Sequence, residues 1–179
     1  MRVIAGRLGG RRLTAPRGAA TRPTSDRVRE ALFSALGDVA GALVCDLYAG
    51  TGALGIEALS RGARRAVFVE SARPALAALR QNLAALGLGD DVARVLPLSV
   101  ERALELLPPE GRFDLAFLDP PYAALLPAAA AAARLAPALA PGGRLVLEHA
   151  SRDAAPEIQG LARDATRTYG DTAVSLYTR

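Results

Sequence analysis

The chain has 179 residues, of which 51% are hydrophobic and 22% charged, enough for one domain with a sizeable core. One cysteine and one histidine exclude an internal disulfide and a cysteine-based metal cluster, so we expect no metal. Prolines flank the apolar run 128–133 and arginine-rich sequence follows Met1, so we expect neither a membrane-spanning helix nor a signal peptide. A cytoplasmic monomer with no membrane partner is expected.

Positive charge is concentrated at the start of the chain. The first thirty residues hold eight arginines against two carboxylates, a net charge of +6, whereas the whole chain carries +4. Such a cluster is typical of a surface that contacts the phosphates and sugars of a nucleic acid, although a solvated tail would look the same. The candidate nucleic-acid contacts are Arg2, Arg7, Arg11, Arg12, Arg22, Thr24 and Arg27.

The N-terminal segment predicts a hairpin followed by a helix. Residues 2–4 and 11–14 flank a Gly-Gly pair and can pair as two short strands. Thr24, Ser25 and Asp26 supply the start signal of a helix that ends before Gly37. Its predicted apolar face consists of Val28, Ala31, Leu32, Ala35 and Leu36.

Alternating strands and helices follow, a pattern typical of a parallel sheet with helices on both faces. The predicted strands are 43–47, 66–70, 92–96, 113–118 and 144–148, with a final antiparallel pair near 161–168 and 172–178. The predicted helices are 53–61, 73–86, 100–107 and 123–140. We therefore expect an α/β Rossmann-like fold. It has a mostly parallel seven-stranded sheet, an antiparallel C-terminal strand and a small N-terminal hairpin and helix. A single domain is expected, with a basic part at 1–37 and a catalytic core at 43–179.

A glycine-rich turn follows the first predicted strand. Residues 50–55 match the dinucleotide fingerprint G-x-G-x-x-G, and a helical stretch follows them. Glu70 closes the next strand at the spacing expected for an acid that binds ribose hydroxyls. Strand, turn, helix, strand and terminal acid together predict a nucleoside cofactor site.

Asp46 bears on which cofactor binds there. It lies four residues before Gly50, where an anion would sit poorly beside the pyrophosphate of a dinucleotide such as NAD. S-adenosyl-L-methionine (AdoMet) carries an ammonium and a sulfonium and no phosphate. The sequence therefore favours AdoMet over NAD.

Residues 119–122 read Asp-Pro-Pro-Tyr and directly follow the predicted strand 113–118. Asp119 and Pro120 both precede a proline, which restricts them to extended conformations. The Asp119 carboxylate and the Pro120 carbonyl could accept the two N–H bonds of an exocyclic amine, and Tyr122 could stack on its ring. A proline-rich turn that merely ends a buried strand is the alternative.

In this order the motifs resemble the bacterial small-subunit ribosomal RNA (guanine-N2)-methyltransferase D family. The resemblance runs from Met1 to about His149, and its most specific part is the block 22–33. It implies a class I AdoMet-dependent methyltransferase that modifies N2 of one guanine of 16S ribosomal RNA in an assembled or nearly assembled small ribosomal subunit.

The motifs and the resemblance together give a set of site residues. The expected catalytic residues are Asp119, Pro120, Pro121 and Tyr122. The expected cofactor contacts are Asp46, Tyr48, Ala49, Gly50, Thr51, Gly52, Glu70, Ser71, Ser99, Val100 and Asp119. Ser99 replaces an acid that often binds the adenine amine in the family, so this contact falls to Ser99 or to the backbone.

Two alternatives remain open from the sequence. An adenine-N6 methyltransferase of DNA or RNA shares the Asp-Pro-Pro-Tyr chemistry, although this short chain leaves no room for the usual target-recognition insert. A non-catalytic RNA-binding factor in ribosome assembly would keep the basic segment and need no cofactor.

Overall fold

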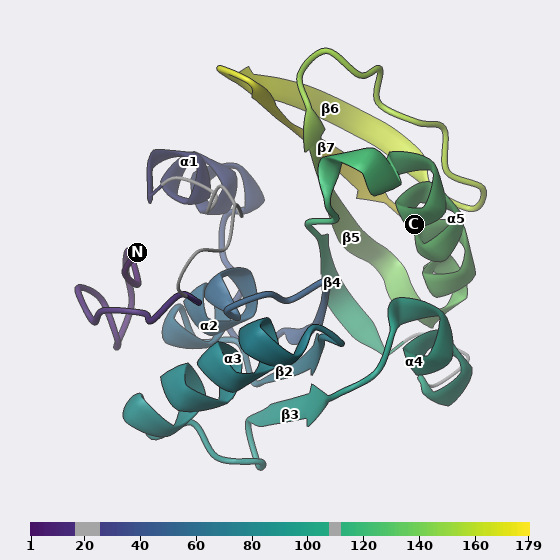
Figure 1. Ribbon diagram of the computed structural model, residues 1–179. Helices are drawn as coiled ribbons and strands as arrows, with labels where there is room; N and C mark the ends of the chain where they lie inside the picture. Colours follow the sequence, from purple (N-terminus) through teal and green to yellow (C-terminus); the bar gives the residue numbers. More distant parts are fainter. Residues whose placement is uncertain (17–25, 108–111) are drawn as a thin grey trace.

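The computed structural model describes residues 1–16, 26–107 and 112–179, without the side chain of Tyr122. It contains a seven-stranded sheet of order β3-β2-β1-β4-β5-β7-β6 (Figure 1). Strands β1 to β5 run parallel to one another, and β7 runs antiparallel to both β5 and β6. The predicted mostly parallel sheet with a reversed C-terminal strand is therefore confirmed.

The element bounds follow the predicted alternation closely. The strands are β1 (Leu43–Leu47), β2 (Arg65–Val69), β3 (Ala93–Leu96), β4 (Phe113–Leu118), β5 (Leu139–Ala150), β6 (Ala162–Tyr169) and β7 (Thr172–Thr178). The α-helices are α1 (Asp26–Leu36), α2 (Ala53–Ser60), α3 (Arg73–Ala85), α4 (Val100–Leu106) and α5 (Leu125–Leu135). Among the helices of the described residues, none is both long and apolar enough to cross a membrane.

Side chains alternate between the two faces of the sheet, because successive strand residues point to opposite sides. Val44, Phe68 and Phe117 pack on one face with residues of α1, α2 and α3. Cys45 and Leu118 pack on the other face with residues of α4 and α5. Both faces are covered, so the parallel strands are apolar almost throughout.

Two predicted elements are wrong in their bounds. The expected helix 123–140 is a 3₁₀ turn (η1, Tyr122–Ala124), then α5, then a second 3₁₀ turn (η2, Ala136–Ala138). Pro137 has no N–H with which to continue the α-helical hydrogen bonds, so α5 ends at Leu135. Strand β5 then begins at Leu139, earlier than predicted, because Leu139 already pairs with Phe113.

The N-terminal segment forms the predicted hairpin, with one antiparallel bridge between Arg2 and Arg12. Val3 and Leu13 are buried in the same core as α1, α2 and α3. The structure thus contradicts a solvated tail for residues 1–16, which are a packed part of the fold. On α1, Val28, Leu32 and Leu36 are buried as predicted, but so are Arg29 and Phe33, whereas Ala31 and Ala35 are half-buried. The predicted cap residues Thr24 and Ser25 lie outside the described residues.

Candidate active site at the strand ends

The predicted polar residues meet where the parallel strands end. Leu47 is in register with Val69 of β2 and with Leu118 of β4, and each of these three residues is the last of its strand. Tyr48, Glu70 and Asp119 follow them directly, so the register brings these residues to one edge of the sheet. The chain order also reverses between β2-β1 and β1-β4, and ligands bind at such a switch point in open α/β sheets.

Asp46 is buried beneath the glycine loop. Its Oδ2 accepts a hydrogen bond of 2.9 Å from the Gly55 N–H, in the first turn of α2. A Cβ on Gly55 would lie 2.3 Å from the Phe68 ring and 3.0 Å from Asp46 Oδ2, so this position has no room for a side chain. The third glycine of the fingerprint therefore allows α2 to pack closely on β2, and it brings the helix amide to the acid.

Glu70 holds the loop from the next strand. Its Oε2 accepts from the Gly50 N–H at 2.8 Å, and its Oε1 accepts from the Ala72 N–H at 2.7 Å. Each carboxylate oxygen has a second lone pair, so Glu70 can still accept from hydroxyl groups of a ligand. Acids already occupy the Gly50 and Gly55 amides that could otherwise hold a pyrophosphate, which disfavours a dinucleotide.

The three acids influence one another. Burial raises the pKa of Asp46 to about 7, and the negative charges of Asp119 and Glu70 add to this increase, while the Gly55 hydrogen bond opposes it. Negative charges that lie close together in a buried site disfavour ionisation of one another. A cationic ligand would supply a compensating positive charge. A pKa perturbed in this way is typical of a functional site.

Tyr48 forms the sharp turn after β1. Its φ of +61° is the only positive φ of a non-glycine residue among the described residues, and it costs on the order of 1 kcal/mol. Burial raises the pKa of the Tyr48 phenol, and the charge of Glu101 at the start of α4 raises it further. Tyr48 also packs against the core cluster that contains Val100 and Ala103, so it connects the end of β1 with α4.

The Asp-Pro-Pro-Tyr segment leaves the sheet beside β1. Asp119 is half-buried, Pro120 is buried and Pro121 is exposed, with Pro121 in an extended conformation before η1. Asp119 directly follows Leu118, which pairs with Leu47, and its charge raises the pKa of Asp46. The side chain of Tyr122 lies outside what the structure describes, so its stacking role stays a prediction.

The remaining predicted cofactor contacts surround this edge. Ala49 and Gly52 are buried, Gly50 and Thr51 are half-buried, and Ser71 is exposed between β2 and α3. Ser99 precedes α4 as its N-cap, where its Oγ accepts from the Arg102 N–H, and Val100 behind it is buried. The Ser99 hydroxyl therefore has a capping role, which leaves the predicted adenine contact to be tested.

The basic residues divide into two groups. Arg2 forms an ion pair of 3.1 Å with Asp26, and Arg11 donates to the carbonyl of Ala85 at the end of α3. Arg7, Arg12 and Arg27 are exposed, and they have no side-chain partner among the described residues. Arg22 and Thr24 lie outside the described residues.

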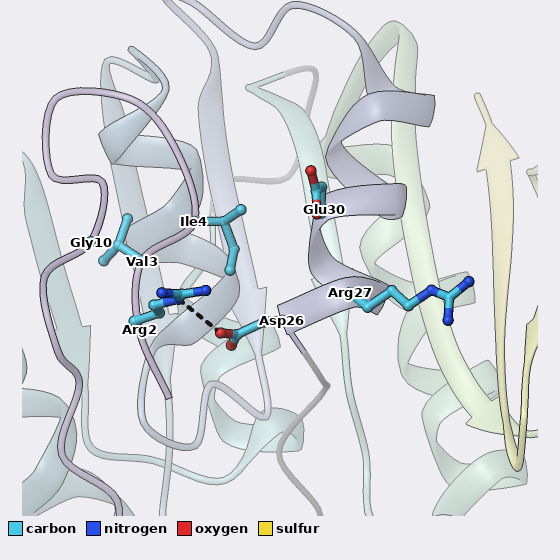
Figure 2. A pocket seen from close by; sticks show the side chains of 7 residues that line it. All are labelled: Arg2, Val3, Ile4, Gly10, Asp26, Arg27 and Glu30. Carbon is cyan, nitrogen blue, oxygen red and sulfur yellow. Dashed lines mark hydrogen bonds and ion pairs between the residues drawn. The ribbon is translucent and has the colours of Figure 1, made fainter.

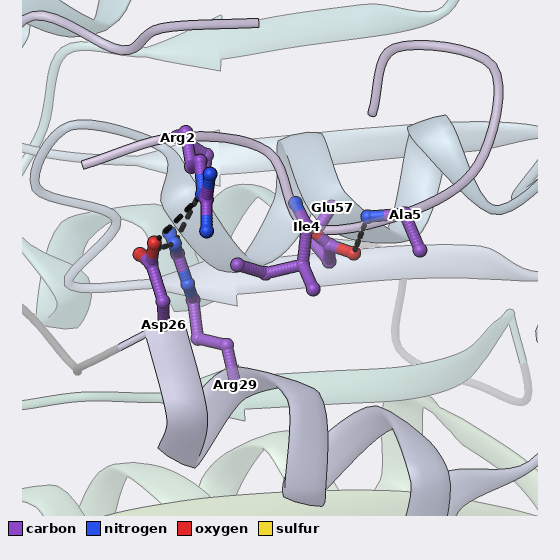
Figure 3. Close-up of polar contacts among 6 residues, drawn as sticks. All are labelled: Arg2, Ile4, Ala5, Asp26, Arg29 and Glu57. Atoms are coloured by element: carbon purple, nitrogen blue, oxygen red, sulfur yellow. Dashed lines mark hydrogen bonds and ion pairs between the residues drawn. The ribbon is translucent and has the colours of Figure 1, made fainter. Parts of the chain in front are cut away.

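Sequence reasoning missed the residues that hold the hairpin in place (Figure 3). Glu57 is fully buried and accepts from the amides of Ile4 and Ala5 at 2.7 and 3.0 Å. Arg29 is also fully buried and donates to Asp26 and to the Arg2 carbonyl, and burial lowers its pKa. A glutamate within the apolar helix α2 was the available signal, since buried acids require partners.

A surface cavity of about 320 Å³ lies between the hairpin and α1 (Figure 2). The Arg2–Asp26 pair lies in it, and the Arg27 side chain extends away from this pair. The cavity is lined by Arg2, Val3, Ile4, Gly10, Asp26, Arg27 and Glu30. None of these residues belongs to the strand-end acids or to the glycine loop, so we place the active site at the strand ends, where the acids converge.

The chain is similar to known proteins over almost its whole length. The family model described as Conserved hypothetical protein 95 matches residues 1–178. The chain belongs to this family. It is 40% identical over 181 residues to the "Putative rRNA methyltransferase YlbH" of Bacillus subtilis, a match that covers 99% of this chain and 98% of that protein. The predicted resemblance to the small-subunit methyltransferase D family is confirmed.

Two matches from Escherichia coli, one to a sequence and one to a solved structure, extend the comparison. "Ribosomal RNA small subunit methyltransferase D" is 42% identical over 124 residues, and this match covers 68% of this chain and 60% of that protein. The solved structure of "Putative methyltransferase yhhF" superposes with a TM-score of 0.84 at 34% identity and covers 100% of this chain and 97% of that chain. The fold is therefore that of the class I methyltransferases.

We expect Glu70→Gln to weaken AdoMet binding at least tenfold. The amide keeps one acceptor oxygen, so either Gly50 or Ala72 loses its partner, and the ribose hydroxyls lose a charged acceptor. Calorimetric titration with AdoMet measures the change. Glu105→Gln, at an exposed acid on α4, is the control, and it should bind AdoMet as the wild type does. Displacement of AdoMet by NAD would instead support a dinucleotide site.

Proposed function

We propose that the protein transfers a methyl group from AdoMet to the exocyclic N2 of one guanine in 16S ribosomal RNA. The observation that carries the proposal is the register of β1, β2 and β4, which brings Asp46, Glu70 and Asp119 together at the strand ends, next to an Asp-Pro-Pro-Tyr segment. Membership of a family with ribosomal RNA methyltransferases supports the substrate class. We propose a cytoplasmic location, where ribosomal subunits are assembled in bacteria.

The residues at the site fit AdoMet by their chemistry. Burial and two neighbouring acids raise the pKa of Asp46, and a positively charged ligand would lower it. The space above Gly50 is open, because a Cβ there would meet only the Tyr48 carbonyl, at 3.9 Å. Asp46 and Glu70 are thus the residues that would hold the cofactor. When bound, AdoMet supplies a methyl group on an already activated sulfonium.

The protein's task is then to orient the acceptor amine. The lone pair of a guanine amine is delocalised into the ring, so the amine is a poor nucleophile. Acceptor bonds to the Asp119 carboxylate and the Pro120 carbonyl orient the two N–H groups and favour localisation of the lone pair on nitrogen. The Asp119 charge also stabilises the positive charge that develops on nitrogen, so orientation and electrostatics supply the catalysis. The base must be unstacked to reach this edge.

Labelled-methyl transfer to three substrates tests the proposal. The substrates are small ribosomal subunits that lack the modification, naked 16S ribosomal RNA and duplex DNA, with nucleoside analysis of the product. We expect N2-methylguanine, most of all in the assembled subunits, because a chain of this size reads little sequence and depends on the folded RNA. N6-methyladenine in DNA or RNA would favour the adenine alternative. No transfer together with no AdoMet binding would favour the non-catalytic assembly factor.

The free arginines of the hairpin give a prediction about RNA binding. Arg7→Gln with Arg12→Gln should weaken RNA binding and reduce the slope of log affinity against log salt by about two, because two fewer phosphates are neutralised. Arg152→Gln with Arg167→Gln removes the same charge near the opposite edge of the sheet and serves as the control. Filter binding over a range of salt concentrations measures both. Equal slopes in the two double variants would place the RNA surface elsewhere.

Deletion of the hairpin would not test this interface cleanly. Val3 and Leu13 are part of the core, and Glu57 would lose the two amides that it accepts from. Truncation of residues 1–18 should therefore lower stability and disturb AdoMet binding as well as RNA binding. Point substitutions of exposed arginines keep these contacts.

A further inference from the structure

Asn82 joins the hairpin directly to the glycine loop. It lies on α3 and is only 2% exposed. Its Oδ1 accepts from the Thr14 N–H at 2.7 Å, and its Nδ2 donates to the Thr14 carbonyl and to the Thr51 carbonyl, each at 3.0 Å. Both hydrogens of the Asn82 amide are used. If the amide were flipped, its NH2 group would face the Thr14 N–H and its oxygen would face the Thr14 and Thr51 carbonyls. The network therefore fixes the orientation of the side chain.

A second attachment links the hairpin to the helix that follows the loop. Glu57 binds the amides of Ile4 and Ala5, and the Ser60 hydroxyl accepts from the Leu8 N–H at 2.9 Å. These contacts lie on α2, so this attachment reaches the loop only through the helix. Asn82 contacts the hairpin at Thr14 and the glycine loop at Thr51, so it is the shorter connection between them.

We infer that Asn82 is a positioning residue that couples the RNA-binding hairpin to the AdoMet loop, so that each ligand strengthens binding of the other. The identity of the two ligands rests on the proposed function. A ligand that orders Thr51 also orders the Asn82 amide and the end of the hairpin at Thr14. The second ligand then meets a surface that is already ordered, and the coupling is reciprocal by thermodynamic linkage.

Substitutions of matched size separate this role from packing. Asn82→Asp keeps the volume and the acceptor for the Thr14 N–H, but it sets a carboxylate oxygen against the two carbonyls. Asn82→Ala removes all three bonds. Gln81→Ala is the control, because Gln81 carries the same amide one residue away and is exposed.

Hydrogen exchange of the hairpin amides with AdoMet alone tests the coupling without RNA. In the wild type and in Gln81→Ala, saturating AdoMet should slow exchange at Leu13 and Thr14 several-fold. In both Asn82 variants AdoMet should bind roughly five- to tenfold more weakly, as expected for a lost hydrogen bond, and at saturation it should leave hairpin exchange unchanged. Unchanged exchange in AdoMet-saturated wild type would overturn the inference and leave the proposed function intact. A wild type that binds no AdoMet would overturn the proposed function itself.

RNA affinity with and without S-adenosylhomocysteine gives the second readout. The wild type should bind 16S ribosomal RNA several-fold more tightly with it, whereas Asn82→Asp should show no difference. Equal enhancement in both proteins would overturn the inference. If the Asn82 variants do not fold, Thr14→Pro removes one of the three bonds from the hairpin side, without a change on α3. Full enhancement in that variant would also count against the coupling.

Discussion

Asp119→Ala is expected to lower the rate of methyl transfer by roughly 100- to 1000-fold, the range typical of a lost charge-stabilising acceptor at a reacting centre. AdoMet affinity should stay within about threefold of the wild type. The Asp119 charge raises the pKa of Asp46, so its removal favours the ionised Asp46 that a cationic ligand requires. Single-turnover transfer and calorimetric titration, on the same preparations, measure the two quantities.

Asp114→Ala is the matched control for this experiment. Asp119 directly follows the C-terminal end of β4, whereas Asp114 lies near the N-terminal end of this strand. There it accepts a hydrogen bond of 2.8 Å from the Leu43 N–H. Its loss should reduce stability slightly and leave turnover unchanged. Near-normal turnover in Asp119→Ala would remove this carboxylate from the mechanism, and equal losses in both variants would indicate a general effect on β4.

Asp46→Asn is expected to abolish detectable AdoMet binding and yet to stabilise the protein without ligand. The folded state raises the pKa of Asp46 from 3.8 to about 7, so it favours the protonated acid. The resulting stability is fully present below about pH 4 and is lost as pH rises from about 4 to about 7, since the unfolded state then binds fewer protons. The substituted amide does not titrate, so above about pH 7 the variant should gain on the order of a few kcal/mol in the free energy of unfolding.

Urea unfolding at several pH values checks the stability, and calorimetry in buffers of different ionisation enthalpy checks the proton balance. In the wild type, AdoMet affinity should rise between about pH 5.5 and about pH 7, because binding requires ionised Asp46 and releases its proton. An AdoMet affinity that does not change over this range would contradict the assigned role. Cys45→Ser, at the neighbouring buried position on the other face of the sheet, is the control for a polar change in β1.

Much of the fold follows from local sequence. The bounds of β1 and β4 are those predicted, because apolar runs that end in Asp-Leu-Tyr and Asp-Pro-Pro stop where the chain must leave the sheet. The glycine turn and Glu70 were also predictable, since their spacing reflects the fixed geometry of a strand, a turn and a helix. The end of α5 was missed because Pro137 and the pairing of Leu139 with β4 outweigh the helical preference of alanine.

The sequence by itself determined which residue types the strand ends carry: Asp46, Glu70 and Asp119 each lie in or directly after an apolar run. Only the tertiary structure decided that the acids share one site, because parallel pairing in register aligns the ends of β1, β2 and β4. It also decided that the hairpin depends on Glu57 and Asn82, which lie more than fifty residues away along the chain. A buried polar side chain needs a partner, but the sequence around it does not reveal which distant backbone supplies one.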